Sequence, residues 1–277
     1  MELDVSRGTD IAIVGATGKT GRAVASALDG VAVVRRLSRS APDFPVDLET
    51  GAGLVEAFTG CRGVYFIAPN VHPDEPALLS RALEAAASAG VDHVLYHSVA
   101  WPYSPTMPHH MDKARCEEEL RAFGSERGVH WTILQPCAYA QNFETVLTGS
   151  PNLVVPYSLD TKFSFVSLDD VAEVAARILV EGANIHHGST YELGGPEMLS
   201  VRDVVRLVEA MTGRSVSLES IGVNEWIDVH GAALSPDAQQ RLSTMFEFYN
   251  DRDFLASSAV AAALLGRSPT PIRALIA

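Results

Sequence analysis

The chain has 277 residues, of which 47% are hydrophobic and 20% charged, and its formal net charge is −13. This composition is that of a globular protein with a core, and the acidic balance argues against nucleic acid or an anionic membrane as a partner. The three cysteines form no C-x-x-C pair, the first ten residues do not look like a signal peptide, and no apolar run reaches the roughly 18 to 20 residues of a membrane span. We therefore expect a cytoplasmic protein with reduced thiols.

The first half of the chain alternates short apolar runs with helical patterns. Strands are predicted at residues 11–14, 31–37, 63–67, 94–97 and 131–134, and helical segments at 22–28, 54–58, 77–89 and 116–123. Alternating strands and helices are typical of a parallel sheet with helices on both faces. The expected fold class is therefore α/β, a doubly wound parallel sheet of the Rossmann type.

The second half is predicted to form a smaller α/β lobe. Helices are expected at 168–179, 199–211 and 255–265, with a short strand at 190–193. Ser200, followed three residues later by Asp203, resembles a capping box at the start of the second helix. We expect residues 1–150 to form a dinucleotide-binding domain and residues 151–277 a substrate-binding lobe that packs on it and is not independent.

A glycine-rich turn follows the first predicted strand. Gly15, Gly18 and Gly21 form G-x-x-G-x-x-G between a strand and a helix, which is the context of the dinucleotide fingerprint. The helix start offers free N–H groups and a positive dipole to a pyrophosphate. Further donors are expected from Thr17, Lys19 and Thr20. The alternative is a glycine-rich turn without a ligand.

The residues after the second strand favour NADP(H) over NAD(H). An enzyme that uses NAD usually has Asp or Glu there to accept from the ribose hydroxyls, whereas this chain has Ser38 and Arg39. A guanidinium can bind a 2′-phosphate. Asp47 is placed to reach the adenine amino group. The alternatives are a solvated basic loop and an ordinary Asp at a helix start.

Several segments resemble the NmrA-like group of atypical short-chain dehydrogenases/reductases. They are GATGKTG after the first strand, SRS after the second, HHMDKARCEEEL and GVHWTILQPCAYAQNF, and the resemblance extends over nearly the whole chain. The group includes NADPH-dependent quinone reductases, isoflavone and benzylic-ether reductases, and redox-sensing regulators. The resemblance therefore implies a Rossmann fold that binds NADP(H).

The resemblance also implies roles for individual residues. Ser98 matches a serine that ends a central strand, and Lys113 matches a lysine that touches the nicotinamide ribose or takes part in proton transfer. His109 stands where the wider superfamily has the tyrosine of Y-x-x-x-K. The remaining cofactor contacts are expected from Pro136 and Tyr139, beside the nicotinamide, and from Ala68 and Pro69. The family often has Leu-Arg-Pro where this chain has Leu134-Gln135-Pro136.

The candidate catalytic residues Lys113, Ser98 and His109 each have a structural alternative. Lys113 can be a surface lysine that pairs with Glu117, four residues on. His109 can act as a general acid with a near-neutral pKa, or it can pack at the start of the following helix. Ser98 can satisfy a backbone group at the strand end. We expect no metal site.

Aromatic residues that follow the predicted strands are candidates for a substrate pocket. A substrate that lies over the nicotinamide would sit at the carboxyl edge of the sheet. Core packing is the alternative for each of these side chains. The expected contacts are Trp101, Tyr103, Tyr139, Phe143 and Phe246.

These observations predict an NADPH-dependent oxidoreductase that reduces a quinone, an enone or another small carbonyl compound. The expected partner is a small, aromatic or quinone-like molecule, and the chain is expected to be a monomer or homodimer. The missing tyrosine leaves open a non-catalytic regulator that binds NADP(H) and senses its redox state through a protein partner. A tailoring enzyme of secondary metabolism on the same scaffold is a third possibility.

Overall fold

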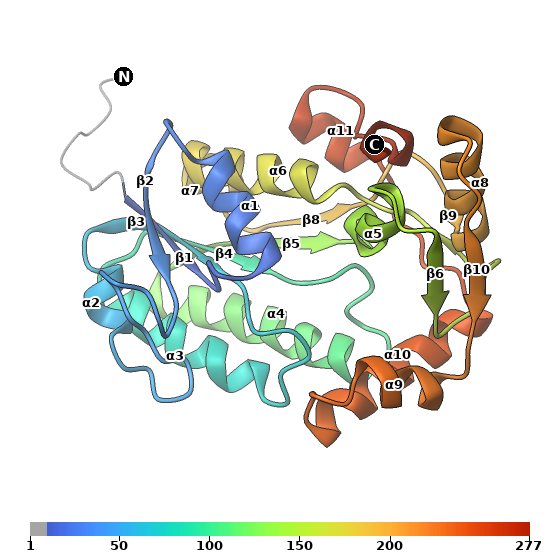
Figure 1. The fold of residues 1–277 in the computed structure, drawn as a ribbon. Coiled ribbons are helices and arrows are strands. Elements are labelled where there is room, and N and C mark those ends of the chain that lie inside the picture. The colour runs from blue at the N-terminus through green and yellow to red at the C-terminus, as the bar shows by residue number, and fades with distance from the viewer. Residues whose placement is uncertain (1–9) are drawn as a thin grey trace.

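A six-stranded parallel sheet forms the centre of the computed structural model, which describes residues 10–277 (Figure 1). The strands lie in the order β2-β1-β3-β4-β5-β8, and every neighbouring pair is parallel. This is the predicted doubly wound α/β fold. The strands are β1 (Asp10–Val14), β2 (Val33–Leu37), β3 (Cys61–Phe66), β4 (His93–His97), β5 (His130–Pro136) and β8 (Ser189–Leu193).

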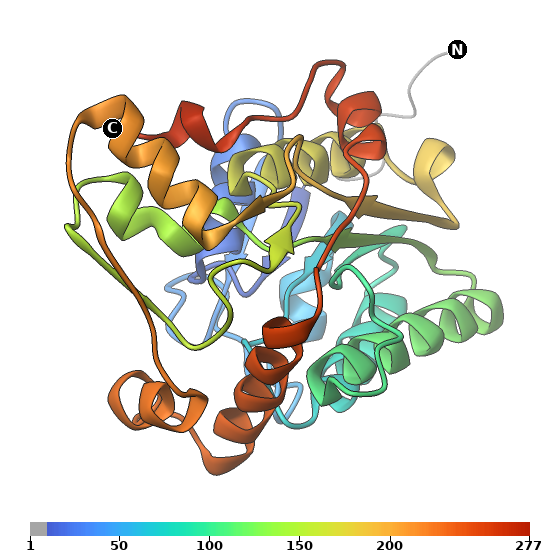
Figure 2. The same ribbon diagram turned by 90° about the vertical axis from the view of Figure 1, so that its right-hand side faces the viewer.

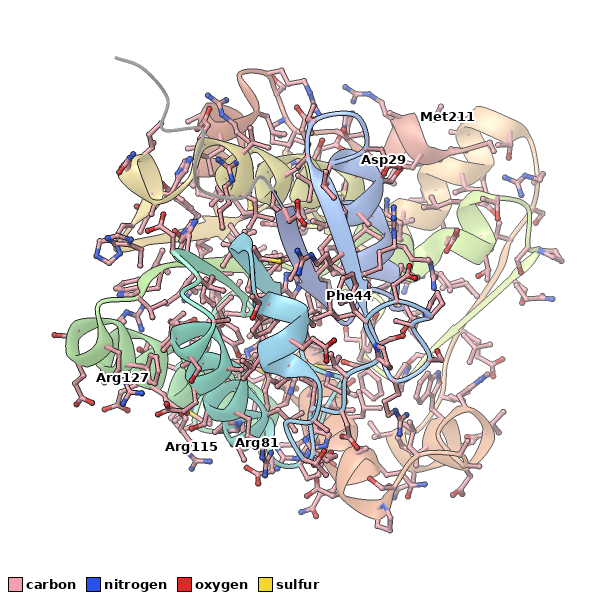
Figure 3. The ribbon with its side chains drawn as sticks, turned by 90° about the vertical axis from the view of Figure 1, so that its left-hand side faces the viewer. Asp29, Phe44, Arg81, Arg115, Arg127 and Met211 are labelled. Carbon is pink, nitrogen blue, oxygen red and sulfur yellow. The ribbon has the colours of Figure 1, made fainter. Side chains whose placement is uncertain are left out.

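Helices cover both faces of this sheet. Figure 1 shows α1, α6 and α7 on one face and α2, α3 and α4 on the other. Figure 3 views the molecule from the side, with the labelled Arg81 on α3 and Arg115 and Arg127 on α4. The first layer is α1 (Lys19–Ala27), α6 (Leu168–Glu181), α7 (Ala183–His186) and α11 (Ala259–Leu265). The second layer is α2 (Leu54–Phe58), α3 (Glu75–Ser88) and α4 (Pro108–Arg127).

Burial of both faces explains why the strands read as continuous apolar runs. In β1, Ala12 and Val14 pack in the core beneath α2, α3 and α4, whereas Ile11 and Ile13 pack beneath α1 and α6. A strand with two buried faces has no polar side to alternate with. The apolar run therefore marks a central strand of a covered parallel sheet.

The smaller lobe has its own core at the carboxyl end of the sheet (Figure 2). Two short strand pairs hold it together: β6 is parallel to β10, and β7 is antiparallel to β9. The predicted capping box is confirmed, because Ser200 and Asp203 cap each other at the start of α8. The elements are β6 (Asn152–Val155), β7 (Lys162–Phe163), β9 (Leu199–Ser200), α8 (Val201–Thr212), β10 (Ser217–Ser220), α9 (Val223–His230) and α10 (Pro236–Asp251), with η1 (Ala140–Phe143), α5 (Glu144–Leu147) and η2 (Ile272–Leu275) beside them.

Several predicted boundaries differ from the structure, among them the start of the helix predicted at 199–211, because Leu199–Ser200 form β9 and α8 begins at Val201. Helix α6 and strand β8 follow residue 150, yet they belong to the main sheet and its helical layer. The chain thus returns to the first body, and a division at residue 150 does not separate the two. The last helix begins at Ala259 rather than at 255, because Phe254 is extended and bonds the backbone of Lys162 and Ser164.

Within residues 10–277, no helix combines the length and the hydropathy needed to cross a bilayer.

Candidate active site

The glycine turn between β1 and α1 is tightly packed at two of its three glycines. Gly15 has φ +76°, and a Cβ atom there would lie 2.7 Å from the carbonyl oxygen of Ile67. A Cβ at Gly21 would lie 2.3 Å from the carbonyl oxygen of Gly15. At Gly18 the nearest atom is 3.3 Å away. Gly15 and Gly21 are therefore required for packing, whereas at Gly18 the added Cβ would make one tight contact, with the carbonyl oxygen of Gly15.

The start of α1 is suited to bind an anion. Gly18 is the N-cap residue, no side chain caps the helix, and its first turn contains no acid. The uncapped N–H groups and the helix dipole favour a negatively charged ligand there. The turn thus fits the pyrophosphate of a dinucleotide, with donors from the backbone.

The side chain of Lys19 is exposed and lies near the smaller lobe. Its ammonium lies 3.4 Å from the carbonyl oxygen of Gln141 and 3.6 Å from the carboxylate of Glu144, so the side chain points toward η1 and α5. There it lines a cavity of about 300 Å³ that Leu168 and Asp169 also border. The side chains of Thr17 and Thr20 remain as the predicted donors in the turn.

Arg39 lies at the carboxyl end of β2, as predicted, and its side chain is exposed. The two nearby arginines already form ion pairs, Arg35 with Asp10 and Arg36 with Asp29. No ion pair of Arg39 occurs within the described part of the chain. The guanidinium beside Ser38 is therefore free to meet a phosphate.

The carboxylate of Asp47 is engaged in a local turn. It accepts a hydrogen bond from the backbone N–H of Glu49 over 2.8 Å. This is the ordinary role of an Asp in a turn, and it supports the structural alternative over a contact with adenine.

The loops after β3 and β4 carry backbone strain. Val71 has φ +46° and Trp101 has φ +54°, and both are residues that rarely adopt a positive φ. Strain of this kind is found where loops are held for function. The β3 loop includes Ala68 and Pro69, and it runs beside the glycine turn, because Ile67 touches Gly15.

Lys113 is buried and does not pair with Glu117. Its ammonium donates to Oε1 of Glu75 over 2.8 Å and to the carbonyl oxygen of His97 over 3.0 Å. The interpretation as a surface lysine is therefore wrong. The contact with His97 places the ammonium at the carboxyl end of β4, beside the predicted nicotinamide site.

The hydroxyl of Ser98 is bound to a buried carboxylate. It donates to Oε1 of Glu117 over 2.6 Å, and the same oxygen accepts from Nε2 of Gln135 over 2.7 Å. Oε2 of Glu117 accepts from Arg121. Ser98 thus satisfies an interior charge, and its proton is not available to a substrate in this arrangement.

His109 does not have the near-neutral pKa expected of a general acid. Burial, with the nearby cation of Lys113, lowers the pKa of His109 to about 2. The ring packs edge-on against His110. The direction of this pKa shift favours the neutral imidazole, and it supports the packing role over the predicted general acid.

His97, which the sequence analysis missed, lies between two tyrosines. Its Nδ1 is 2.6 Å from the hydroxyl of Tyr65, and its Nε2 is 3.1 Å from the hydroxyl of Tyr139. Burial lowers the pKa of His97 to about 3, so the ring is neutral. Burial raises the pKa of Tyr139, and the nearby Thr20 side chain of the glycine turn partly offsets this rise, which places the Tyr139 hydroxyl near the predicted cofactor.

The other predicted substrate contacts are dispersed. Phe143 and Phe246 are buried in the core of the smaller lobe, because they pack on other aromatic rings. Trp101 packs edge-on against Phe254, and Tyr103 is 65% exposed. Of the predicted set, the structure brings Tyr139 close to the glycine turn, and Pro136 ends the strand just before it.

Helix α10 of the smaller lobe reaches the same region. Arg241 forms an ion pair with Asp112, which directly precedes Lys113, and donates to the carbonyl oxygen of Pro73. This pair joins α10 to α4 and to the loop after β3. Within residues 10–277, no three His, Cys, Asp or Glu side chains lie close enough together to hold a metal ion.

The sequence matches the NmrA-like family over residues 8–265. A (4-alkanoyl-5-oxo-2,5-dihydrofuran-3-yl)methyl phosphate reductase of Streptomyces griseus is 30% identical over 226 residues, which are 77% of this chain and 78% of the relative. An NAD(P)H azoreductase of Xenophilus azovorans is 26% identical over 230 residues, 78% of each chain.

Two solved structures share the fold over nearly the full length. Triphenylmethane reductase of Citrobacter sp., complexed with NADP(H), has a TM-score of 0.79 at 20% identity, over 96% of this chain and 98% of the other. NADPH-dependent quinone oxidoreductase of Escherichia coli, complexed with NADPH, has a TM-score of 0.78 at 19% identity, with the same coverage. The family match spans both bodies of the fold, and this chain belongs to the NmrA-like family.

Proposed function

We propose that this protein is an NADP(H)-dependent reductase of small conjugated carbonyl compounds, such as quinones and enones. The observation that carries the proposal is the uncapped start of α1 at Gly18, with the free guanidinium of Arg39 at the end of the neighbouring strand. Together they offer one site for a pyrophosphate and another for a 2′-phosphate. The reduced nicotinamide, when bound, supplies the hydride.

The scarcity of acidic proton donors near Lys113 favours conjugated substrates over simple ketones, since burial raises the pKa of the nearby Tyr139 hydroxyl. His109 is uncharged, Ser98 donates to Glu117, and the superfamily tyrosine is absent from α4. A simple ketone needs a proton at its oxygen as the hydride arrives. A conjugated acceptor spreads the negative charge over several atoms, so a fixed cation such as Lys113 and protons from solvent suffice.

The names of the relatives support a conjugated acceptor as the substrate, although only some of them name a carbonyl compound. The Streptomyces griseus relative is named for a dihydrofuran with a 5-oxo and a 4-alkanoyl group, which is a ring double bond conjugated to carbonyls. The azoreductase, the triphenylmethane reductase and the quinone oxidoreductase are likewise named for conjugated substrates. A conjugated, electron-poor acceptor is the chemistry that these names share.

The experiment is a fluorescence titration with NADPH and NADH of the wild type, Arg39→Asp and Arg36→Asp. Arg36 is a matched control, because it is also exposed but pairs with Asp29. We expect tight NADPH binding whose preference over NADH is lost in Arg39→Asp and kept in Arg36→Asp. Turnover of quinones and enones, but not of simple ketones, completes the test. If neither dinucleotide binds, the proposal is wrong.

The same scarcity of proton donors supports one alternative, a redox sensor that binds NADP(H) and acts through a protein partner. Tight binding of NADPH without turnover of any conjugated acceptor, together with a partner that binds only one redox form, would favour it. Turnover by the wild type would exclude a purely sensing role.

A further inference from the structure

Glu75 is a fully buried carboxylate in the first turn of α3, next to Lys113. Its Oε1 accepts from the ammonium of Lys113 over 2.8 Å and from the hydroxyl of Tyr96 over 2.7 Å. The side chain of Glu75 is 0% exposed, while that of Lys113 is 7% exposed. The carboxylate of Glu75 therefore lies deeper in the protein than the ammonium of Lys113.

Three features offset the cost of burying this negative charge. Lys113 supplies the opposite charge, the start of α3 supplies a helix dipole, and Tyr96 supplies a neutral O–H donor. Burial and the neighbouring carboxylate raise the pKa of Tyr96 well above its usual value, so the phenol keeps its proton. An isolated buried carboxylate would be unstable, but this one belongs to a compensated group.

The pair also fixes the direction of the ammonium. A lysine ammonium has three N–H groups, and two of them donate to Glu75 and to the carbonyl oxygen of His97. Both acceptors are part of rigid elements, since one lies on α3 and the other ends β4. The third N–H remains for a ligand at the carboxyl edge of the sheet.

We propose that Glu75 is a positioning residue that holds Lys113 as a fixed cation against the nicotinamide ribose. This inference rests on the proposed function, and it concerns the nicotinamide half of that same site. It also assigns Lys113 the role of binding the ribose rather than of donating a proton. A lysine that gave up its proton would leave Glu75 as an uncompensated buried charge, which is strongly unfavourable.

The test is a double-mutant cycle of Glu75→Gln and Lys113→Met, read out as binding of two probes. NADPH contains the nicotinamide ribose, and adenosine 2′,5′-bisphosphate lacks it. In Glu75→Gln the amide nitrogen can take the position of Oε2, which is buried without a partner in the described structure. The carbonyl oxygen of the glutamine keeps the acceptor for Tyr96 and for Lys113, so the variant removes the negative charge that holds the ammonium and leaves the two hydrogen bonds possible. Glu84→Gln is the matched control, because Glu84 lies on the same helix in an exposed pair with Arg127.

We expect Glu75→Gln to weaken NADPH binding about tenfold, a mid-range coupling for residues in contact, and to leave the bisphosphate within about twofold. In the Lys113→Met background, Glu75→Gln should not weaken NADPH binding further, because the cation that Glu75 positions is already absent. Glu84→Gln should change neither probe. Equal losses for both probes, or the same loss with and without Lys113, would overturn the inference, because Glu75 would then act on the fold as a whole.

If Glu75→Gln does not fold, Lys113→Met is compared with the double variant, in which no unpaired charge is buried. An NADPH affinity of the double variant that equals or exceeds that of Lys113→Met supports the inference, because Glu75→Gln then only removes the unpaired buried charge, and a further loss in the double variant contradicts it. The wild type separates this inference from the proposed function. If the wild type does not bind NADPH, the proposed function is contradicted. If the wild type and Glu75→Gln bind NADPH equally well, only the role of Glu75 is contradicted.

Discussion

The side-chain amide of Gln135, at the end of β5, donates to the fully buried carboxylate of Glu117 on α4 over 2.7 Å. Gln135 is a neutral donor, so its hydrogen bond does not balance the charge of the carboxylate. The compensating charge comes from Arg121, one helical turn after Glu117. The network therefore anchors α4 to two strands and places Ser98 in a structural role.

We expect Ser98→Ala to reduce stability more than activity. It removes one hydrogen bond to a buried charged group, which is worth about 2 kcal/mol, and it leaves Gln135 and Arg121 in place. Urea unfolding measures the loss, and kcat/KM with a quinone should change less than about threefold. Gln135→Met, which removes the other donor to the same oxygen, should lose a similar amount of stability. A large fall in kcat at unchanged stability would instead place the Ser98 hydroxyl on the substrate.

Gly18→Ala should block the cofactor with only a small effect on the fold. The backbone of Gly18 has φ −72°, which alanine adopts readily, and the new Cβ would meet only the carbonyl oxygen of Gly15, at 3.3 Å. The methyl group would occupy the surface at which a pyrophosphate approaches. We expect a smaller fall in melting temperature than in Gly21→Ala, and NADPH binding weakened by about tenfold or more.

Gly21→Ala is the contrasting variant, since its Cβ would lie 2.3 Å from the same oxygen. It should lower the melting temperature as well as the affinity. If Gly18→Ala binds NADPH normally, the anion does not approach the turn from this side.

Features set by neighbours in the sequence were predictable. The spacing of Gly15, Gly18 and Gly21 determines a turn between β1 and α1, and Ser200 with Asp203 determines the start of α8. The alternation of apolar runs predicted the parallel sheet, which is confirmed. Each of these features depends on a few consecutive residues whose spacing is visible in the chain.

The partners of the site residues were not predictable in this way. Glu75 is 38 positions from Lys113, and Arg241 is 129 positions from Asp112. No local pattern links such pairs, because packing of separate helices brings them together. The near-neutral pKa predicted for His109 differs from the lowered pKa in the structure for the same reason, because the burial of this ring depends on elements that are distant in sequence. An acid directly after the helix cap Asp74 was the only available signal for Glu75.

Removing the pair between Arg241 and Asp112 should loosen α9 and α10. Both side chains are largely buried, and truncating one partner of a buried pair costs about 3 kcal/mol. We expect Arg241→Met to speed amide hydrogen exchange over residues 223–251 while the strands of the main sheet stay protected. Arg206→Met, which breaks an exposed pair with Asp203, is the control and should leave that exchange unchanged. Equal exchange in both variants would mean that the pair does not hold α10 in place.

Buried neutral histidines should make the protein sensitive to acid. Burial lowers the pKa to about 4 in His93, 3 in His97, 2 in His109 and 4 in His110. The unfolded chain takes up these protons near pH 6.5, whereas the folded chain does not, so stability falls as the pH drops below that value. Each histidine contributes up to about 1.4 kcal/mol per pH unit.

His97→Gln tests this relation, because glutamine keeps a donor and an acceptor between Tyr65 and Tyr139 but cannot be protonated in this range. Urea unfolding at several pH values from about 7.5 to about 5, on both sides of the histidine pKa of about 6.5, gives the slope of the unfolding free energy against pH. We expect that slope to be smaller in the variant by up to about 1.4 kcal/mol per pH unit, whatever its absolute stability. An unchanged slope would mean that the folded protein protonates His97 as readily as the unfolded chain does, and the ring would then be open to solvent and not held between the two tyrosines.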